Sequence, residues 1–394
     1  MADPLSAARE VGPLELLVVQ PTPFCNLDCS YCYLPNRSDT RRMALATLDR
    51  AFRWVAESGL VREPFAVLWH AGEPLVVPVE WYEGATELLH QYGADWSVTQ
   101  SFQTNATLID ARWCRYFLRH EIDVGVSVDG PAFLHDRHRR TRGGGGTLDR
   151  VLRGIHTLND HEVPFRVITV LTDEALDCPD ELFDFYLANG ISSVGFNPEE
   201  VEGPNTASSL QVDGSVPRFR RFLARFLDLA LSADPPLHVR EFELSANALL
   251  HARRDGPVRR TQENRAFGIV NVDCEGNFST YSPELLGLDS PRYGSFALGH
   301  VATDSLDAVL ASARFARMEA EIAEGVQMCR ESCRYFPFCG GGPPGNKHFE
   351  NGSFASTETL FCRLHVKSCL DVTADRLERH PVACEVGGSE RAAP

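Results

Sequence analysis

Residues 20–35 read QPTPFCNLDCSYCYLP and contain three cysteines, Cys25, Cys29 and Cys32, with the spacing C-x3-C-x2-C. They follow the apolar stretch LELLVVQ (residues 14–20), which predicts a buried strand. In barrel-like parallel sheets, the loops at the carboxyl ends of the strands carry the active site. The sequence therefore predicts a site built on three thiolates at that end of the first strand.

Three thiolates leave one position of a metal centre without a protein ligand. A structural zinc site closes with four ligands, and the nearest further candidate, His70, lies on another predicted element. An iron–sulfur cluster with one open iron binds a substrate or cofactor directly. The spacing therefore favours an iron–sulfur cluster over zinc at this loop.

Predicted strands alternate with predicted helices from residue 14 to about residue 235. Short apolar runs predict strands at residues 14–20, 65–69, 96–103, 122–128, 165–171 and 192–197. Apolar residues at helical spacing predict helices at residues 43–57, 80–92, 111–119, 148–158, 181–188 and 216–231. Six strand–helix units make a parallel sheet with outer helices and fall short of the eight units of a closed barrel. We therefore predict an α/β fold, a partial (β/α)6 barrel with a C-terminal cysteine-rich domain.

Composition narrows the classes of partner. The 394 residues carry a net charge of −16, which argues against nucleic acid as a partner. No apolar run approaches the roughly 20 residues of a membrane span, and the N-terminus has no apolar signal segment. We therefore expect a cytoplasmic protein without a membrane partner. Structural disulfides are rare in that compartment, so the clustered members of the 12 cysteines indicate metal ligation.

The same patterns divide the chain. We expect an N-terminal tail (1–13), the partial barrel (14–235), a bridging helical segment (236–265), a cysteine-rich domain (266–375) and a C-terminal tail (376–394). The cysteine-rich domain is also rich in Gly and Pro and is expected to be irregular.

The cysteine loop resembles the cluster loop of radical S-adenosylmethionine (radical SAM) enzymes, C-x3-C-x-aromatic-C, with Tyr31 as the aromatic residue. The resemblance covers the predicted barrel. It implies that Cys25, Cys29 and Cys32 hold a [4Fe–4S] cluster whose open iron is chelated by the amino and carboxylate groups of S-adenosyl-L-methionine. It also implies that an electron from this cluster cleaves the sulfonium and yields a 5′-deoxyadenosyl radical.

Two further strand ends resemble motifs of the same family. HAGEP (residues 70–74) resembles the family's GGEP motif, so Gly72, Glu73 and Pro74 are expected at the amino group of the cofactor. A carboxylate beside a closely approaching backbone suits an ammonium ligand. FQTNAT (residues 102–107) resembles the next motif and implies that Gln103 and Asn105 line the cofactor pocket.

The fourth strand ends in SVDGP (residues 127–131). The resemblance places Ser127 and Asp129 at the ribose hydroxyls of the cofactor. It places Arg139 at the cofactor's carboxylate, with Arg142 as the alternative. Each motif is weak alone, but all of them follow successive strands in the expected order.

The C-terminal stretches MCRESCRYFPFCGGGPPGNK (328–347) and LFCRLH (360–365) resemble the SPASM domain of peptide-modifying radical SAM enzymes. That domain carries cysteines for two auxiliary [4Fe–4S] clusters. Tyr281 and Pro343 stand where two ligands of the first auxiliary cluster are expected. The resemblance therefore implies one auxiliary [4Fe–4S] cluster, with four ligands: Cys329, Cys333, Cys339 and Cys362.

Alternatives to this ligand set stay open. This set leaves Cys274 over, and Cys369 is a candidate substitute for one of the four ligands. Four thiolates also suit zinc, so a four-cysteine zinc site is the alternative to a cluster in this domain.

Over nearly its whole length the chain resembles the GrrM/OscB-type cyclophane-forming peptide maturases, most clearly in WHAGEPL (69–75) and CGGGPPGNKHFENGSF (339–354). The resemblance implies a crosslink between an aromatic ring and the β-carbon of a residue two positions on, in a ribosomally made precursor peptide. It implies an electron donor, which the sequence does not identify. Asp273 is a candidate general base by position, with a solvated loop aspartate as the alternative.

Two other functions compete with this interpretation. One is a different radical SAM peptide modification, either formylglycine-type oxidation or a thioether crosslink. The other is a non-enzymatic iron–sulfur or zinc module that binds peptides, which would release no 5′-deoxyadenosine from S-adenosylmethionine. The order of the pocket motifs argues against the second.

Overall fold

The structure is a computed structural model that describes residues 11–92, 96–254 and 260–379. Most of the two predicted tails, with Cys384, and residues 255–259 of the predicted bridging segment lie outside the described residues. Ten strands form one sheet in the order β12-β9-β8-β1-β2-β3-β4-β5-β6-β7. None of the described helices is long and apolar enough to cross a membrane.

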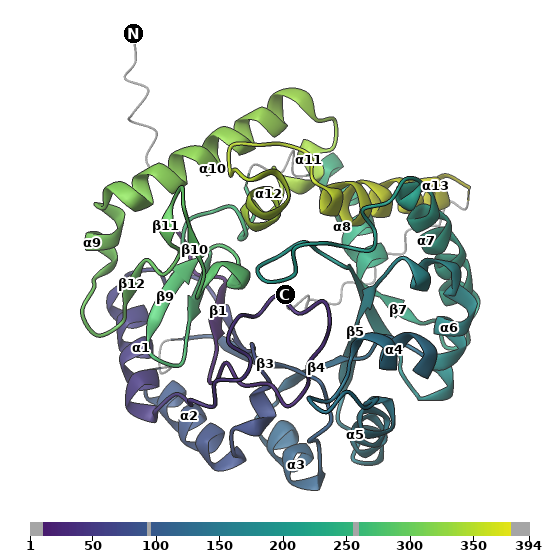
Figure 1. The fold of residues 1–394 in the computed structure, drawn as a ribbon, viewed down its shortest axis with the longest axis horizontal. Coiled ribbons are helices and arrows are strands. Elements are labelled where there is room, and N and C mark those ends of the chain that lie inside the picture. Colours follow the sequence, from purple (N-terminus) through teal and green to yellow (C-terminus); the bar gives the residue numbers. More distant parts are fainter. Residues whose placement is uncertain (1–10, 93–95, 255–259, 380–394) are drawn as a thin grey trace.

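Seven strands of this sheet pair with their neighbours in parallel and form the curved wall of a partial barrel (Figure 1). They are β1 (Leu16–Val19), β2 (Phe65–Trp69), β3 (Val98–Thr104), β4 (Asp123–Ser127), β5 (Phe165–Leu171), β6 (Ser193–Pro198) and β7 (His238–Val239). Apolar runs such as LLVV and FAVLW suit these positions because both faces of a parallel sheet are covered.

Helices surround the sheet on its outer side (Figure 1). They are α1 (Leu45–Glu57), α2 (Val79–Tyr92), α3 (Ala111–Arg119), α4 (Ala132–His138), α5 (Leu148–Asp160), α6 (Pro179–Ala188) and α7 (Ser215–Ser232). Each buries one apolar face; in α1 that face includes Leu48, Phe52 and Val55. The predicted α/β partial barrel is confirmed. Helix α4 and the short 3-10 helices Pro74–Val76 and Glu174–Asp177 were not predicted from the sequence, nor was β7, which lies beyond the predicted end of the barrel at residue 235.

The C-terminal region continues the same sheet. Its strands in that sheet are β8 (Ile269–Val272), β9 (Asn277–Thr280) and β12 (Gly299–His300), whereas β10 (Asp289–Ser290) and β11 (Gly294–Ser295) pair with each other in a separate two-stranded sheet. Strand β8 pairs in parallel with β1, and β9 returns antiparallel to β8. The sequence pattern did not predict this pairing, which places the β8–β9 hairpin beside the cysteine loop that follows β1.

The remaining helices are α8 (Arg240–Arg254), α9 (Leu306–Leu310), α10 (Ala313–Ser332), α11 (Phe336–Cys339), α12 (Pro344–Asn351) and α13 (Cys369–Arg379), the last preceded by a π-helical turn (Cys362–Ser368). The prediction that this region is irregular is wrong, because α10 alone has 20 residues. The side-chain oxygen of Ser312 caps α10, and Phe315, Met318, Ile322 and Val326 form its buried face.

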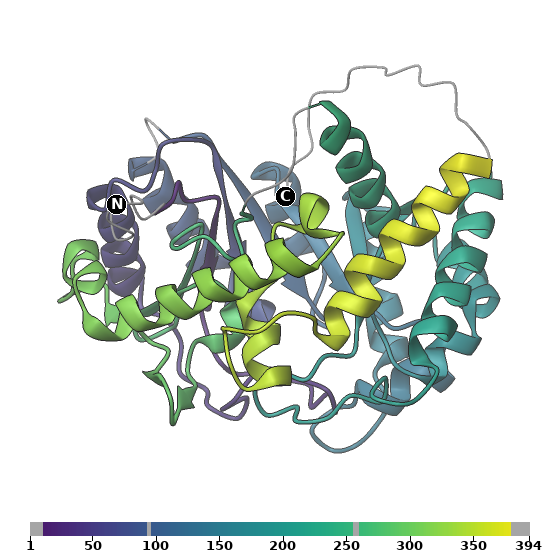
Figure 2. The same ribbon diagram turned by 90° about the horizontal axis from the view of Figure 1, so that it is seen from above.

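These C-terminal helices fill the side of the molecule opposite α2, α3 and α5 (Figure 1). Turning the molecule shows α10 and α13 lying along this side (Figure 2). They therefore cover the part of the ring that the partial barrel leaves open (Figure 1).

Candidate active site

The loop after β1 is fastened to the segment that follows α4. The backbone N–H of Asp28 donates to the carbonyl of Arg140 at 2.8 Å, and that of Ser30 donates to the carbonyl of His138 at 3.0 Å. The cysteines of this loop, which form no disulfide, line one cavity of about 330 Å³. The predicted cluster ligands Cys25, Cys29 and Cys32 are therefore brought together.

Gly72 allows the HAGEP turn to pack directly against the cysteine loop. Its φ is +60°, and a Cβ at this position would lie 2.5 Å from the carbonyl oxygens of both Thr22 and Phe24. The next residue, Glu73, donates its N–H to the Phe24 carbonyl at 2.8 Å. No side chain fits at Gly72 without moving the loop that carries the cysteines.

Glu73 is buried, and its carboxylate is held by three donors. The N–H of Leu75 and the hydroxyl of Thr104 donate to Oε1 at 3.0 and 2.6 Å, and the N–H of Asn105 donates to Oε2 at 2.8 Å. Burial raises the pKa of Glu73 to about 7, against the effect of these hydrogen bonds. Glu73 faces the cavity, whereas Pro74 begins a short 3-10 helix (Pro74–Val76) behind it.

Asn105, Gln103 and Ser127 form the next part of the cavity wall. The amide of Asn105 donates to the Asn26 side-chain oxygen at 2.8 Å and lies 3.8 Å from the Cys25 sulfur. The amide of Gln103 donates to the Ser127 hydroxyl at 2.8 Å. The strand ends that the motifs picked out therefore meet at the cysteine loop.

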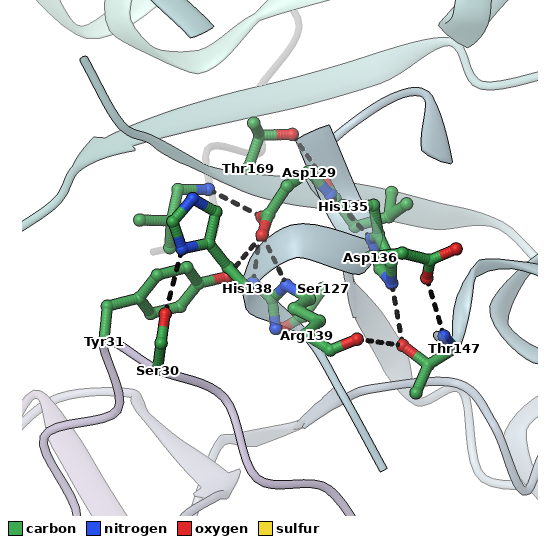
Figure 3. A network of polar contacts seen from close by, with 12 residues as sticks. Ser30, Tyr31, Ser127, Asp129, His135, Asp136, His138, Arg139, Thr147 and Thr169 are labelled. Carbon is green, nitrogen blue, oxygen red and sulfur yellow. Dashed lines mark hydrogen bonds and ion pairs between the residues drawn. The ribbon is translucent and has the colours of Figure 1, made fainter. Parts of the chain in front are cut away.

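Asp129 and Arg139 form a buried ion pair (Figure 3). The Arg139 Nε and Nη2 groups donate to Oδ2 and Oδ1 at 2.8 and 3.1 Å, the Val170 N–H donates to Oδ1 at 3.0 Å, and the Tyr31 hydroxyl donates to Oδ2. Burial acts to raise the pKa of Asp129, but the charge and hydrogen bonds of Arg139 outweigh it and the pKa is lowered.

This ion pair gives Asp129 and Arg139, both predicted to bind the cofactor, different places relative to the cavity. Tyr31 and Arg139 line the cavity, but Asp129 lies behind them with both carboxylate oxygens occupied. In the structure Asp129 therefore positions Tyr31 and Arg139, and its contact with a ribose stays a prediction.

Arg142, the alternative to Arg139, lies on the outside of the cysteine loop. Its Nε donates to the Cys25 carbonyl at 2.8 Å, and its Nη1 donates to the Ser38 hydroxyl at 3.0 Å. Its guanidinium lies 5.0 Å from the centre of the Phe24 ring. Arg142 fastens the loop, whereas Arg139 faces the cavity.

Asp273 is a turn residue in the structure. Its Oδ1 accepts the N–H groups of Glu275, Gly276 and Asn277, each at 2.9 Å, and its Oδ2 accepts the Asn277 amide at 2.9 Å. Asp273 shapes the β8–β9 turn and is not among the residues that line the cavity. The hypothesis that it is the general base is therefore withdrawn, in favour of its alternative as a loop aspartate.

Four other acidic residues line the same cavity, and they were not predicted from the sequence. They are Glu199, Glu200, Glu202 and Glu284. Burial, with repulsion from neighbouring carboxylates, raises the pKa of Glu200 to about 7 and that of Glu284 to about 8, and it raises the pKa of Glu202 well above its usual range. The available signal was NPEEVEG (197–203), a run of acidic residues at the carboxyl end of the sixth predicted strand.

His70 also lines the cavity and pairs with an aromatic hydroxyl. The Tyr33 hydroxyl and His70 Nε2 are 2.8 Å apart. Burial lowers the pKa of His70 to about 4, so the ring is neutral near pH 7.

The second cysteine cluster surrounds a cavity of about 410 Å³. Its walls include the four predicted ligands Cys329, Cys333, Cys339 and Cys362. Cys369 and Cys274 are not among the lining residues. Within the described part of the chain, no three His, Cys, Asp or Glu side chains lie close enough together to hold a single metal ion. Each cavity has room and thiol ligands for a group of several atoms, which suits a [4Fe–4S] cluster.

Tyr281, at the position of one absent cysteine, is fully buried. Its hydroxyl donates to the carboxylate of Glu319, which also accepts the Arg260 guanidinium at 3.0 Å. A phenol, a carboxylate and a guanidinium therefore fill the surroundings of this position. This packing supports the prediction of a single auxiliary cluster.

The family model described as the radical SAM superfamily matches residues 19–186. The uncharacterized protein sll1766 of Synechocystis is 43% identical over 372 residues, which are 93% of each chain. The serine-type anaerobic sulfatase-maturating enzyme of Klebsiella aerogenes is 32% identical over 224 residues, which are 56% of this chain and 55% of that enzyme.

Solved structures share the fold at lower identity. The structure of anSMEcpe with bound AdoMet and the Cp18Cys peptide has a TM-score of 0.74 and 19% identity, and the match covers 93% of this chain and 98% of that one. Streptococcus suis SuiB bound to its precursor peptide SuiA has a TM-score of 0.60 and 17% identity, over 90% of this chain and 76% of that one.

The partial barrel, the three-cysteine loop and these matches define the class of protein: the chain belongs to the radical SAM superfamily. Its cofactors are therefore S-adenosylmethionine and [4Fe–4S] iron–sulfur clusters.

Proposed function

We propose that this radical SAM enzyme is a peptide maturase that joins an aromatic ring to the β-carbon of a nearby residue in a ribosomally made precursor peptide. The observation that carries the proposal is the cavity of about 330 Å³ whose lining includes both the three cysteines Cys25, Cys29 and Cys32 and the carboxyl groups of Glu200 and Glu284. Oxidative crosslinking needs both parts, because it removes a hydrogen atom and later a proton.

The cysteines and the neighbouring strand ends that line this cavity would hold the cofactors. Cys25, Cys29 and Cys32 would ligate the catalytic cluster, and Glu73 would accept the amino group of S-adenosylmethionine, since its carboxylate faces the cavity. Gln103, Asn105, Ser127 and Arg139 would complete the pocket. When bound, these cofactors supply a 5′-deoxyadenosyl radical that removes one hydrogen atom from the β-carbon of the peptide.

The carboxyl groups of Glu200 and Glu284, which line the same cavity, would take up the proton. After the β-carbon has bonded to the ring, the ring regains its aromaticity when it loses one electron and one proton. Carboxyl groups with pKa values near 7 and 8, such as Glu200 and Glu284, exchange protons readily near neutral pH. We infer that this carboxyl group cluster is the proton acceptor.

The electron would leave through the second cysteine cluster. The second cavity is lined by four cysteines, Cys329, Cys333, Cys339 and Cys362, which would ligate all four irons of an auxiliary [4Fe–4S] cluster and leave none open to the substrate. When bound, such a cluster would supply an electron acceptor. An external donor would reduce the catalytic cluster.

Formylglycine-type oxidation is the second candidate, supported by the sequence similarity to a sulfatase-maturating enzyme. It needs the same hydrogen abstraction, proton acceptor and electron acceptor. Oxidation of a serine and formation of a ring crosslink each remove two hydrogen atoms, so intact mass does not separate them. An aldehyde reacts with a hydrazide probe, whereas a ring crosslink does not.

The test is anaerobic co-expression with the precursor peptide encoded beside this gene, followed by tandem mass spectrometry and hydrazide labelling. The proposal expects a product that has lost two hydrogen atoms, resists labelling and does not fragment between the joined residues. The variant with Cys25, Cys29 and Cys32 replaced by Ala is the matched control and should leave the peptide unmodified. A labelled product would favour formylglycine formation, and release of no 5′-deoxyadenosine would indicate a binding module.

A further inference from the structure

A buried lysine reaches into the second cysteine cavity. Lys347 lies on α12, and only 4% of its surface is exposed. Its Nζ group donates to the sulfur of Cys329 at 3.5 Å, and the two residues both line the cavity of about 410 Å³. The ammonium therefore lies directly beside a proposed cluster ligand.

A glycine on the facing helix makes room for this ammonium. Gly325 lies one turn before Cys329 on α10, and a Cβ there would lie 3.3 Å from the Lys347 Nζ and 2.2 Å from the Phe354 carbonyl oxygen. The absence of a side chain at Gly325 allows both α12 and the Phe354 segment to approach α10 closely. The close packing around Gly325 therefore fixes the position of the Lys347 side chain.

No Asp or Glu within the described residues forms an ion pair with Lys347. A buried ammonium without a countercharge is costly, so its position indicates an anion nearby. The groups that can supply this anion are the thiolates of the cavity. Four thiolates around a [4Fe–4S] core carry a net negative charge, which an adjacent ammonium would stabilise.

We propose that Lys347 is the countercharge of the auxiliary cluster and raises its reduction potential, an inference that rests on the proposed ligation by the four cysteines. Reduction adds one negative charge to the cluster, and a nearby positive charge in a water-poor cavity stabilises the reduced form more than the oxidised form. Lys347 thereby makes the cluster a better acceptor of the electron that leaves the crosslinked ring.

Lys367 is the matched control because it lines the same cavity with its charge already partnered. Its Nζ group pairs with the carboxylate of Glu358, and its side chain is 19% exposed. Its Nζ also lies 5.4 Å from the centre of the Tyr335 ring. Removal of this charge should affect the cluster much less than removal of the Lys347 charge.

The experiment is a potentiometric titration of the auxiliary cluster in anaerobically reconstituted full-length protein. Electron paramagnetic resonance measures the reduced fraction of the cluster at each potential. Cys25, Cys29 and Cys32 are replaced by Ala in every sample, so that only the auxiliary cluster contributes to the signal. Lys347→Met should make the midpoint potential more negative, while Lys367→Met should leave it close to that of the parent. An unchanged midpoint in Lys347→Met with full iron content would overturn the inference.

Iron analysis separates this inference from the proposed function. A parent protein without auxiliary iron would show that the cluster assignment itself is wrong. If Lys347→Met loses its iron, Lys347→Gln is titrated in its place with the same expectation. Loss of iron in both neutral variants but not in Lys347→Arg would support the countercharge, whereas loss in all three would assign Lys347 to packing alone and overturn it.

Discussion

The guanidinium of Arg139 donates to both carboxylate oxygens of Asp129, at 2.8 and 3.1 Å, in a pair that is nearly inaccessible to solvent. The same carboxylate accepts the hydroxyl of Tyr31, which belongs to the cysteine loop. One ion pair therefore connects the cysteine loop, the end of β4 and the segment after α4 (Figure 3). It also sets how Tyr31 and Arg139 face the cavity that the cysteines line.

Asp129→Asn tests this connection. The variant leaves the buried guanidinium of Arg139 without its countercharge, so we expect a loss of about 3–5 kcal/mol in the free energy of unfolding. Chemical denaturation of the anaerobic protein measures this loss. Because the folded-state pKa of Asp129 is lowered, the deficit should be complete at neutral pH and shrink as the pH falls through that pKa. Equal stability of variant and parent at neutral pH would show that the pair contributes nothing.

Glu73→Gln should weaken the binding of S-adenosylmethionine by about 1–3 kcal/mol, as expected for the loss of a hydrogen-bonded charge partner. Since the pKa of Glu73 is about 7 and the ammonium prefers the carboxylate, affinity in the parent should rise with pH through about 7. The variant should lose this rise and keep its iron. Calorimetry at several pH values measures both effects, and an unaltered affinity profile would make Glu73 a turn residue only.

Gly72→Ala should displace the cysteine loop, because the new Cβ would overlap the carbonyl oxygens of Thr22 and Phe24. We expect loss of the catalytic cluster, measured as iron per chain, with the auxiliary iron retained. Gly144→Ala is the matched control: Gly144 also has a positive φ, of +82°, but a Cβ there meets nothing within 4 Å. Full iron content in Gly72→Ala would show that the loop accommodates the methyl group.

The parent enzyme should contain about eight irons, from two [4Fe–4S] clusters. Tyr281 and its partner Glu319 fill the surroundings of one absent ligand, which leaves cysteines for only one auxiliary cluster. Iron analysis and Mössbauer spectroscopy measure the number and type of clusters. About twelve irons, or zinc at the C-terminal cysteines, would contradict this ligand assignment.

Much of the barrel could be predicted from sequence because several of its strands, such as β1 and β2, are short and wholly apolar runs. The predicted strands at 65–69 and 165–171 coincide with β2 and β5. Helix α10 was missed although its buried residues from Phe315 to Val326 recur at helical spacing. The many Gly, Pro and Cys residues around it favoured an irregular region, and the tertiary packing of this apolar face decided otherwise.

Single residues of the candidate site could be predicted where they belong to a sequence motif. Contacts between residues from distant segments of the chain could not be predicted. The sequence placed Asp129 and Arg139 near the cofactor but did not indicate that they pair with each other. Glu200 and Glu284 are far apart in the chain and meet only because β6 and the C-terminal strands belong to one sheet. Asp273 was chosen by position, and its turn hydrogen bonds became visible only in the folded hairpin.

Glu284→Gln should separate cleavage of the cofactor from formation of the product. The carboxyl group lines the same cavity as the cysteines but is neither a thiol ligand nor part of the proposed cofactor pocket, so cluster content and release of 5′-deoxyadenosine should persist while crosslinking falls. In the parent, crosslinking should increase as the pH rises through about 7 to 8, because the unprotonated carboxylates accept the proton. Asp273→Asn is the control and should retain this pH profile. Parallel loss of 5′-deoxyadenosine and product in Glu284→Gln would argue against a role in proton transfer.

The most direct test of the proposed crosslink is tandem mass spectrometry of the precursor peptide after anaerobic reaction with the reconstituted enzyme, S-adenosylmethionine and a reductant. The expected product has lost two hydrogen atoms and yields no fragments between an aromatic residue and the residue two positions on. Complete fragmentation through every aromatic position, in a reaction that does release 5′-deoxyadenosine, would contradict it.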